Sequence, residues 1–459
     1  MKDRFGFDGS KMTGSFFWNR PQLGRRMFFR HMASAVSGYF LMPSRPMETI
    51  ARAAQTPKGT AKKCIFILMA GAPSHVDTFD LKEGPWTPAA FNPTSFGDVR
   101  FPQGLMPKIA GQLDAIALLR SVRSWAAVHQ LSQTWVQIGR NPVNGLAKIA
   151  PHIGSVVSLE LRQQDRDKTL PAFFSLNAGG SVAGAGYLPP EHAPFYVSPN
   201  GAGLPNTTHR DGAARFDSRY GLLMDLDADL RYGQNPLGPA PVEMSAFNLD
   251  AVKLMYNSDV DQIFNFSPDE RLRYGNSTFG NACITARNLL HANKGTHFVQ
   301  ITFGSWDHHT NIYAPNTQLT PMARQFDNAL GTLLSDMRND GSLNETLIVA
   351  MGEFGRTVGP PNQTNGRDHF LQQSALFAGA GIQGGRAVGS TDDRGFDTID
   401  TGWHRDRYVR PEDIEATIYS ALGIDWTTVR HDDPLGRGFE YVPFAASQDL
   451  YGPVHELWG

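Results

Sequence analysis

The sequence predicts an α/β fold in which a doubly wound, mostly parallel sheet carries helices on both faces. Short apolar runs rich in β-branched residues recur along the chain, and helical patterns lie between them. The apolar runs are continuous rather than alternating, which is typical of strands buried on both faces of a sheet. Acidic and imidazole side chains directly follow several of these runs. Such side chains would meet at one edge, since ligands in open α/β sheets gather outside the carboxyl ends of the strands.

Six apolar runs are the candidate strands. The first is continuous and suits a central position in the sheet. The fourth ends at Gly304 and Ser305, which mark a turn. In chain order, the predicted strands span residues 64–69, 115–119, 170–176, 298–303, 346–351 and 375–378.

Helices are predicted between and after these strands. Apolar residues recur at three- and four-residue steps in 321–337, directly after a proline. Residues 411–423 begin with proline, carry acids in the first turn and stop at glycine. A further helix is predicted over 124–135, and it contains His129.

Two segments stand apart from this alternation. Residues 179–241 are rich in Gly, Pro, Asn and Asp, and they predict a loop-rich insertion that caps the sheet edge, where selectivity would reside. Residues 1–61 are predicted to be an export signal and linker. The α/β domain is therefore expected to span residues 62–459.

The signal is predicted from the segment 24–30, Gly-Arg-Arg-Met-Phe-Phe-Arg, which resembles a twin-arginine export signal. A weakly apolar stretch follows at 31–42, too short to span a bilayer. An A-x-A-like cleavage site lies at 51–53. We expect export by the twin-arginine machinery to the periplasm or beyond the cell. The alternative is a basic tail with an accidental arginine pair.

Composition excludes some partners. The chain has 459 residues and a formal net charge of −2, so there is no electrostatic case for nucleic acid or an anionic membrane. Its two cysteines, Cys64 and Cys283, lie in apolar contexts. They are expected to be buried thiols rather than metal ligands or nucleophiles, with a disulfide as the alternative.

Asp307 and His309 are the strongest candidate metal ligands. Alternate residues of an extended segment point the same way, so the two could hold one ion together. Carboxylate oxygen and imidazole nitrogen are ligands that borderline divalent metals prefer. His308 should face away and support the pair. In the alternative interpretation, Asp307 caps a turn and His309 packs.

Further candidates follow the next strand along the chain. Glu353 comes directly after the run 346–351, where it is either a ligand or a cap for its loop. Asp368 and His369 are adjacent, so they could bind two ions, or one could bind while the other orients it.

Two arginines and the loop after the first strand complete the set. Arg356 and Arg367 could hold the oxyanion group of a substrate in a catalytic role, with buried ion pairing as the alternative. His75 and Asp77 are candidate ligands because their loop leaves the same sheet edge.

Four spaced motifs carry a resemblance to a known family. They lie at 72–80, 306–311, 351–357 and 366–369. Together they resemble domain of unknown function 1501, a family of exported bacterial proteins that is a branch of the alkaline phosphatase superfamily. The resemblance extends from Lys62 to the C-terminus, and the twin-arginine signal also matches.

The resemblance implies an alkaline phosphatase-like sheet with one or two metal ions at its C-terminal edge. Phosphatases, sulfatases and phosphoglycerate mutases in that superfamily use two metals to activate a nucleophile and hold the transferred group. By motif, Asp307 and His309 match the superfamily's Asp-then-His ligands. Glu353 falls where an Asp-His pair usually follows its strand, and Asp368 with His369 falls near the later histidine ligand.

The sequence departs from the superfamily pattern in two places. The usual aspartate after the first strand is replaced by Ala70-Gly71, so His75 or Asp77 would have to substitute. In the superfamily, the nucleophile usually lies on the helix after the second strand, about ten residues before a glycine. Counting back from Gly139, this position is occupied by His129. The implication is that His129 is a ligand or covalent acceptor, or that this branch has lost the reaction.

The sequence therefore predicts a metal-dependent hydrolase acting on a phosphate or sulfate ester of a small molecule or glycan. Zinc is the first choice of ion, with calcium, magnesium and manganese as alternatives. The alternative function is a secreted metal-binding or surface-interaction protein without catalysis. The predicted catalytic residues are His129, Arg356 and Arg367, and the predicted ligands are Asp307, His309, Glu353, Asp368, His369, His75 and Asp77.

Overall fold

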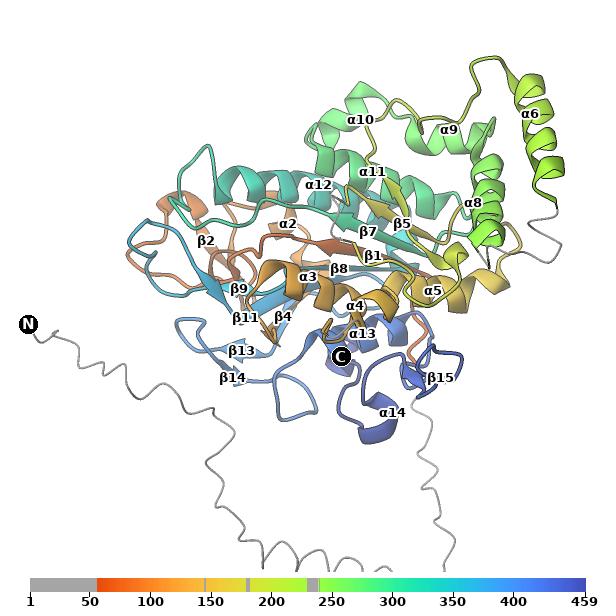
Figure 1. Cartoon of the computed structure of the whole chain (residues 1–459). Helices are drawn as coiled ribbons and strands as arrows, with labels where there is room; N and C mark the ends of the chain where they lie inside the picture. The colour runs from red at the N-terminus through yellow and green to blue at the C-terminus, as the bar shows by residue number, and fades with distance from the viewer. Residues whose placement is uncertain (1–55, 144–145, 179–181, 229–237, 239) are drawn as a thin grey trace, which may run out of the picture. The chain divides into compact units, whose positions relative to one another are not determined.

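An eight-stranded sheet runs through the centre of the protein (Figure 1). The computed structural model describes residues 56–143, 146–178, 182–228, 238 and 240–459. These residues belong to one compact unit, Thr56–Gly459. The predicted export signal and its cleavage site lie outside the described residues.

Every strand of the sheet runs in one direction except β11, which is antiparallel to both of its neighbours. The start of β11 therefore lies at the edge where β1, β4, β7 and β8 end. In spatial order the strands are β12 (Arg386–Val388), β4 (Ile116–Arg123), β11 (Gln372–Ala378), β8 (Thr346–Met351), β1 (Lys63–Leu68), β7 (Phe298–Thr302), β5 (Phe173–Leu176) and β6 (Phe195–Val197).

Alternate residues of the central strands enter two separate cores, because successive side chains of a strand point to opposite faces. In β1, Ile65 and Ile67 belong to one core, whereas Cys64 and Phe66 belong to the other. All six residues of β1 are buried. Burial on both faces explains why the strand is a continuous apolar run in the sequence.

Helices cover both faces of the sheet, as the sequence predicted (Figure 1). On one face lie α2 (Pro107–Ala110), α11 (Thr278–His291) and α12 (Leu319–Asn339). On the other lie α3 (His129–Ile138), α5 (Ile153–Leu161) and α13 (Pro411–Ala421). The fold class is thus confirmed, and each of the six predicted strands overlaps an observed one. The main boundary difference is β4, which continues to Arg123.

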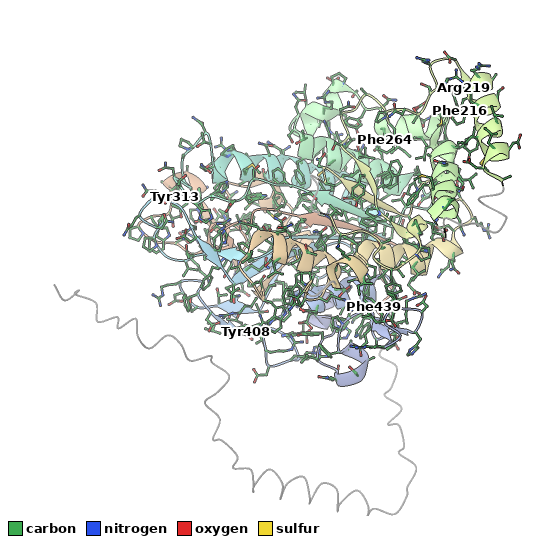
Figure 2. All side chains as sticks on the ribbon, in the orientation of Figure 1. Phe216, Arg219, Phe264, Tyr313, Tyr408 and Phe439 are labelled. Carbon is green, nitrogen blue, oxygen red and sulfur yellow. The ribbon has the colours of Figure 1, made fainter. Side chains whose placement is uncertain are left out.

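The segment 179–241 contains more regular structure than its composition predicted. It supplies the edge strand β6 and helix α6 (Ala213–Leu226), which buries none of its side chains. Phe216 and Arg219 of α6 lie far from the sheet (Figure 2). The following helices are α8 (Ala240–Leu254), α9 (Ser258–Phe264) and α10 (Pro268–Arg273).

Small elements complete the described part of the chain. Of these, β9 (Gly355–Arg356) and β10 (His369–Phe370) form a two-stranded hairpin near the sheet edge. Two short helices lie outside the central sheet, α4 (Leu146–Ile149) and α14 (Ala445–Gln448). Three further strand pairs also lie outside it: β2 (Pro93–Phe96) with β3 (Val99–Pro102), β13 (Ser390–Thr391) with β14 (Thr398–Asp400), and β15 (Val429–Arg430) with β16 (Phe439–Glu440).

Both cysteines are buried and unbonded, as predicted. Across the part of the chain that the structure describes, no helix combines the length and apolar character needed to cross a membrane.

Candidate metal centre

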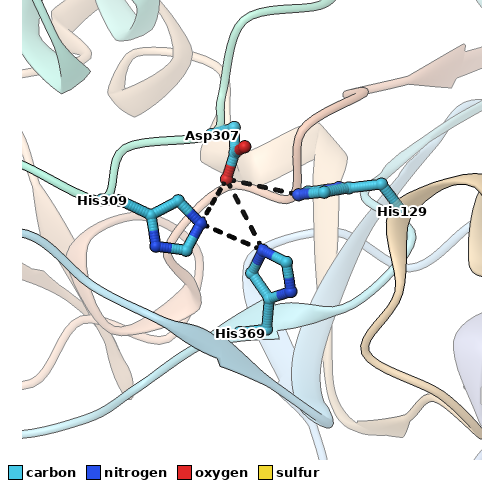
Figure 3. A group of neighbouring side chains, drawn as sticks. All are labelled: His129, Asp307, His309 and His369. Atoms are coloured by element: carbon cyan, nitrogen blue, oxygen red, sulfur yellow. Dashed lines mark hydrogen bonds and ion pairs between the residues drawn. The ribbon is translucent and has the colours of Figure 1, made fainter.

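Four side chains from three segments of the chain converge at the carboxyl edge of the sheet (Figure 3). They are His129, Asp307, His309 and His369, and one ligand atom from each lies within 4.8 Å of all the others. Asp307 and His309 follow β7, His129 is the first residue of α3, and His369 begins β10. We call this group the four-residue cluster.

The cluster is centred on one carboxylate oxygen. Asp307 Oδ1 lies 2.9 Å from Nε2 of His309, 3.2 Å from Nε2 of His129 and 3.7 Å from Nε2 of His369. The Nε2 atoms of His309 and His369 are themselves 3.1 Å apart. All three imidazoles therefore present the same nitrogen to the centre.

Local backbone geometry places Asp307 there. After β7 the chain turns through Ser305, which has a φ of 75°. The loop after β1 packs closely against this turn, since a Cβ added at Gly71 would lie 2.7 Å from the Trp306 nitrogen. Glycine is therefore required where a superfamily aspartate was expected, and Asp307 is held at the end of the neighbouring strand.

Two carboxylates orient two of the imidazoles. Nδ1–H of His129 donates to Glu353 Oε1 at 2.6 Å, and Nδ1–H of His309 donates to Asp368 Oδ1 at 3.0 Å. Because a carboxylate only accepts, each Nδ1 carries the proton and each Nε2 keeps a lone pair for the centre. Carboxylate partners of this kind are the usual second layer around metal-binding histidines.

The third imidazole is oriented by the main chain. Nδ1–H of His369 donates to the Ala127 carbonyl at 2.8 Å, so its Nε2 also faces the centre with a lone pair. In the hairpin, His369 pairs with Arg356. The segment just before α3 thus fixes a residue that is distant in sequence.

Arg356 provides the positive charge beside Asp307. Its Nη2 donates to Asp307 Oδ1 at 2.5 Å, and its Nε donates to the Ala72 carbonyl at 2.9 Å. Burial raises the pKa of Asp307, but the hydrogen bond and charge of Arg356 outweigh it and bring the pKa below its ordinary value. The Asp307 carboxylate is therefore ionised at neutral pH and available to a cation.

The donor set fits a divalent cation. Nε2 of His129 is buried without a hydrogen-bond partner among the described residues. Two imidazole lone pairs also face each other between His309 and His369. Three imidazoles and one carboxylate are typical of zinc and other borderline metals. The side chains of Asp307 and His309 are 44% and 41% exposed, so the cluster is open to solvent.

Two predicted ligands lie behind the cluster rather than in it. Glu353 is fully buried, and its Oε1 accepts hydrogen bonds from His129, from the Gly71 amide and from Gln133. Asp368 contacts the outer side of His309. We correct the predicted roles of Glu353 and Asp368 accordingly, because each carboxylate is used to orient a histidine.

His75 and Asp77 are not part of the cluster, which is a second correction. They form a buried turn after β1, the 3₁₀ helix His75–Asp77. Nε2–H of His75 donates to the Gly395 carbonyl at 2.9 Å. Asp77 Oδ2 accepts from Arg367 Nε at 2.7 Å and from the Ser74 hydroxyl at 2.6 Å.

The two predicted substrate-binding arginines are both committed to the protein. Arg367 is fully buried, and besides Asp77 its guanidinium donates to Tyr313 and to the carbonyls of Thr357 and Gly359. Arg356 is 1% exposed and donates to carbonyls and to Asp307. Both arginines therefore form ion pairs with aspartates of the protein, which is the alternative predicted from the sequence.

His129 joins the cluster; from the sequence resemblance it was expected to be a further ligand or a covalent acceptor. The nearby hydroxyls of Ser132 and Thr134 donate to the carbonyls of Ala126 and Gln130. His308 is buried, and burial lowers its pKa to about 4. It is not one of the four residues of the cluster, and its ring lies 6.4 Å from the ring of Trp306.

Comparisons with known proteins place this fold and site in context. Residues 61–443 match the model of a family described as a protein of unknown function, DUF1501. No match was found among curated proteins.

Several solved structures are similar at low identity. A sulfatase from Pseudoalteromonas sp., PsFucS1, is 12% identical with a TM-score of 0.39, covering 80% of this chain and 68% of that one. Ps i-CgsB, solved in complex with k-i-k-neocarrahexaose, is 12% identical with a TM-score of 0.39, covering 85% and 76%. The alkaline phosphatase of the Antarctic bacterium TAB5 is 14% identical with a TM-score of 0.32, covering 71% and 92%.

Proposed function

The chain belongs to the DUF1501 family, and on that premise we propose that it is an exported metal-dependent hydrolase of phosphate or sulfate esters. One observation carries the proposal. Three imidazoles with fixed Nε2 atoms and one ionised carboxylate meet at a solvent-exposed point on the carboxyl edge of the sheet. Active sites in open α/β sheets occupy this edge.

His129, Asp307, His309 and His369 would hold one ion. A bound divalent cation would supply Lewis-acid chemistry, activating water and stabilising negative charge on the transferred group. Asp307 offsets part of the charge of the cation, and the three histidines fix its position. Glu353 and Asp368 keep the imidazoles of His129 and His309 from rotating, so the site is preorganised.

The position of Arg356 favours one ion over two. Its Nη2 lies 2.5 Å from Asp307 Oδ1, and its Nη1 lies 3.2 Å from His309 Nε2. A permanent cation thus occupies the side of the cluster that a second ion would need. Two positive charges at such a distance repel strongly unless they share further carboxylates.

Zinc is the proposed ion. Calcium and magnesium prefer oxygen ligands, and magnesium keeps much of its water shell. A set of three imidazole nitrogens and one carboxylate oxygen matches zinc better. Manganese, calcium and magnesium are the less favoured alternatives.

The substrate class and the destination complete the proposal. The ester would be carried by a small molecule or a glycan that reaches the open face of the cluster. The segment 24–30 would direct the folded protein through the twin-arginine route to the periplasm or outside the cell.

The test combines metal analysis with substrate screening. The mature protein is purified without chelator, its metals are measured by elemental analysis, and phosphate and sulfate esters are screened in parallel. We expect close to one zinc per chain and hydrolysis that chelation removes and zinc restores. A metal-free protein that hydrolyses no ester would overturn the proposal.

A second candidate is a secreted metal-binding protein without catalysis. It is favoured by the hydroxyls of Ser132 and Thr134, which are tied to backbone carbonyls and so are poor nucleophiles. A full complement of zinc with no hydrolysis of any ester would decide for this candidate.

A further inference from the structure

A second pocket opens between α3, the start of α13 and the C-terminal segment. It has a volume of about 670 Å³, and its lining includes Trp125, Trp135, Arg140, Glu412 and Phe444. This volume lies within the range of small-molecule sites. We call it the Trp125 pocket. None of the four residues of the metal cluster lines it.

Two tryptophans in this pocket are locked in place by one buried carboxylate. The Trp125 indole N–H lies 3.1 Å from each oxygen of Glu412, and the Trp135 indole N–H donates to Glu412 Oε1 at 2.9 Å. The two rings stack with centroids 6.2 Å apart, and the Arg410 guanidinium lies 3.9 Å from the Trp125 ring centroid. Trp125 is nevertheless 43% exposed. The pocket therefore presents a rigid aromatic surface to solvent.

The polar part of the pocket lining contains charged groups of both signs, Arg140 with Glu412 and Glu440, and uncharged polar groups beside them. The Glu412 carboxyl is buried and already accepts the indole N–H groups of both tryptophans, and burial raises its pKa to about 7. Arg140 Nη2 donates to the carbonyls of Glu440 and Tyr441, while its Nε is buried without a hydrogen-bond partner in the described structure. Asn141 adds an amide to the lining. The lining thus offers hydrogen-bond donors and acceptors rather than charges of a single sign.

A neutral sugar ring matches both properties of the pocket. One face of a pyranose is made of C–H groups that pack on an aromatic ring, and its edge carries hydroxyls that both donate and accept. The pocket offers exposed aromatic surface at Trp125 and Phe444, with amide and guanidinium groups beside it. We propose that the Trp125 pocket binds a neutral sugar ring of an oligosaccharide.

The pocket is connected to the metal cluster through a short segment. Trp125 and His129 are four positions apart in the chain, so their Cα atoms are at most about 14 Å apart. Between them, the Ala127 carbonyl accepts the Nδ1–H of His369. An oligosaccharide ester could therefore place a sugar ring on Trp125 and its ester at the cluster. This connection rests on the proposed function, whereas sugar binding by the pocket does not.

The experiment measures binding, not turnover. The full mature protein is applied to an array of neutral and ester-bearing oligosaccharides, and the best binder is titrated by calorimetry. Trp125→Ala should weaken its affinity about tenfold or more, because the stacked aromatic surface is removed. Trp125→Phe keeps an aromatic ring and should weaken it less. Phe247→Ala removes a comparably exposed aromatic residue, 45% exposed on α8, and should change nothing.

The possible outcomes separate this inference from the proposed function. His129→Ala should lose the ion yet still bind the sugar, so failure of the metal site leaves the pocket testable. The inference is overturned if no oligosaccharide binds, or if Trp125→Ala, shown to be folded by its melting temperature, binds as tightly as the native protein. Trp125-dependent binding of tetramethylammonium in place of sugars would also overturn it, since that would identify a cation site.

Discussion

Nδ1 of His129 lies 2.6 Å from Oε1 of Glu353, and this contact joins the first residue of α3 to the loop after β8. Glu353 is fully buried, and it contacts the cluster through the imidazole of His129 that it orients. The hydrogen bond to Glu353 also raises the pKa of His129 above its ordinary value.

Glu353→Gln should weaken metal binding without abolishing it. The amide cannot hold the His129 tautomer as a carboxylate does, and loss of such a partner typically costs about 10–100-fold in affinity. Zinc affinity is measured by competition with a chelating dye. Asp368→Asn tests the corresponding contact on His309, and an unchanged affinity in both variants would remove the orienting role.

Asp307→Ala should abolish bound metal. Asp307 Oδ1 is the only carboxylate oxygen in the four-residue cluster, and the variant would leave Arg356 as an unopposed cation beside the site. Elemental analysis of the purified variant gives the stoichiometry. His404→Ala, at an exposed histidine paired with Glu456, is the matched control and should retain the native metal content. Full metal in Asp307→Ala would refute its ligand role.

Arg367→Ala should destabilise the fold. Arg367 and Asp77 are a fully buried ion pair with an Nε–Oδ2 distance of 2.7 Å, and leaving one partner alone costs about 3–5 kcal/mol. Urea unfolding monitors the free energy of unfolding, and exposed Arg394→Ala should leave it unchanged. If Arg367→Ala has the native free energy of unfolding but no longer hydrolyses esters, Arg367 has the catalytic role that the sequence predicted.

Stability should fall on acidification because of His152. Burial lowers its pKa from 6.5 to about 3, so below pH 6.5 the unfolded chain takes up a proton that the folded chain does not. By linkage, the free energy of unfolding decreases as the pH drops from 6.5 towards 3, by about 2 kcal/mol at pH 5. His152 caps α5 through Nδ1, which accepts from the Gly154 amide.

Unfolding in urea at pH 7 and pH 5 measures this loss. His152→Asn keeps a capping acceptor but cannot titrate, so its stability should change less between the two pH values. His404→Asn should retain the native pH dependence. An identical pH dependence in His152→Asn would show that other groups are responsible.

Arg25→Lys combined with Arg26→Lys should hold the protein in the cytoplasm. The twin-arginine route reads the arginine pair itself rather than its charge, so a conservative exchange is sufficient. Cell fractionation and immunoblotting compare the variant with the native chain. Lys62→Arg, outside the signal, is the control. Unaffected export would exclude this route.

Much of the fold follows from local sequence, because buried parallel strands need continuous apolar runs. The residues 64–69 and 346–351 are predicted almost to the residue by this requirement. The edge strand β6 was missed because it has only three residues and an exposed tyrosine at its centre, Tyr196. An edge strand needs no continuous apolar run.

The meeting of acidic and imidazole residues at strand ends was also predictable, but the directions of their side chains were not. Asp307, His309 and His369 follow or precede strands that share one edge, so sequence position alone brings them together. Glu353 has the same kind of position, yet its side chain turns to His129 rather than to the centre. Asp77 is diverted by Arg367, which lies far away in the sequence. Such long-range pairing has no local signature.

The guanidinium of Arg356 affects the charge of the proposed metal site when no cation is bound. It is anchored by carbonyls from the loop after β1, and so Asp307 keeps a counter-charge whether or not the site is filled. At the proposed metal site, Asp307 would therefore not be left as an unpaired carboxylate when no cation is bound, because Arg356 already pairs with it.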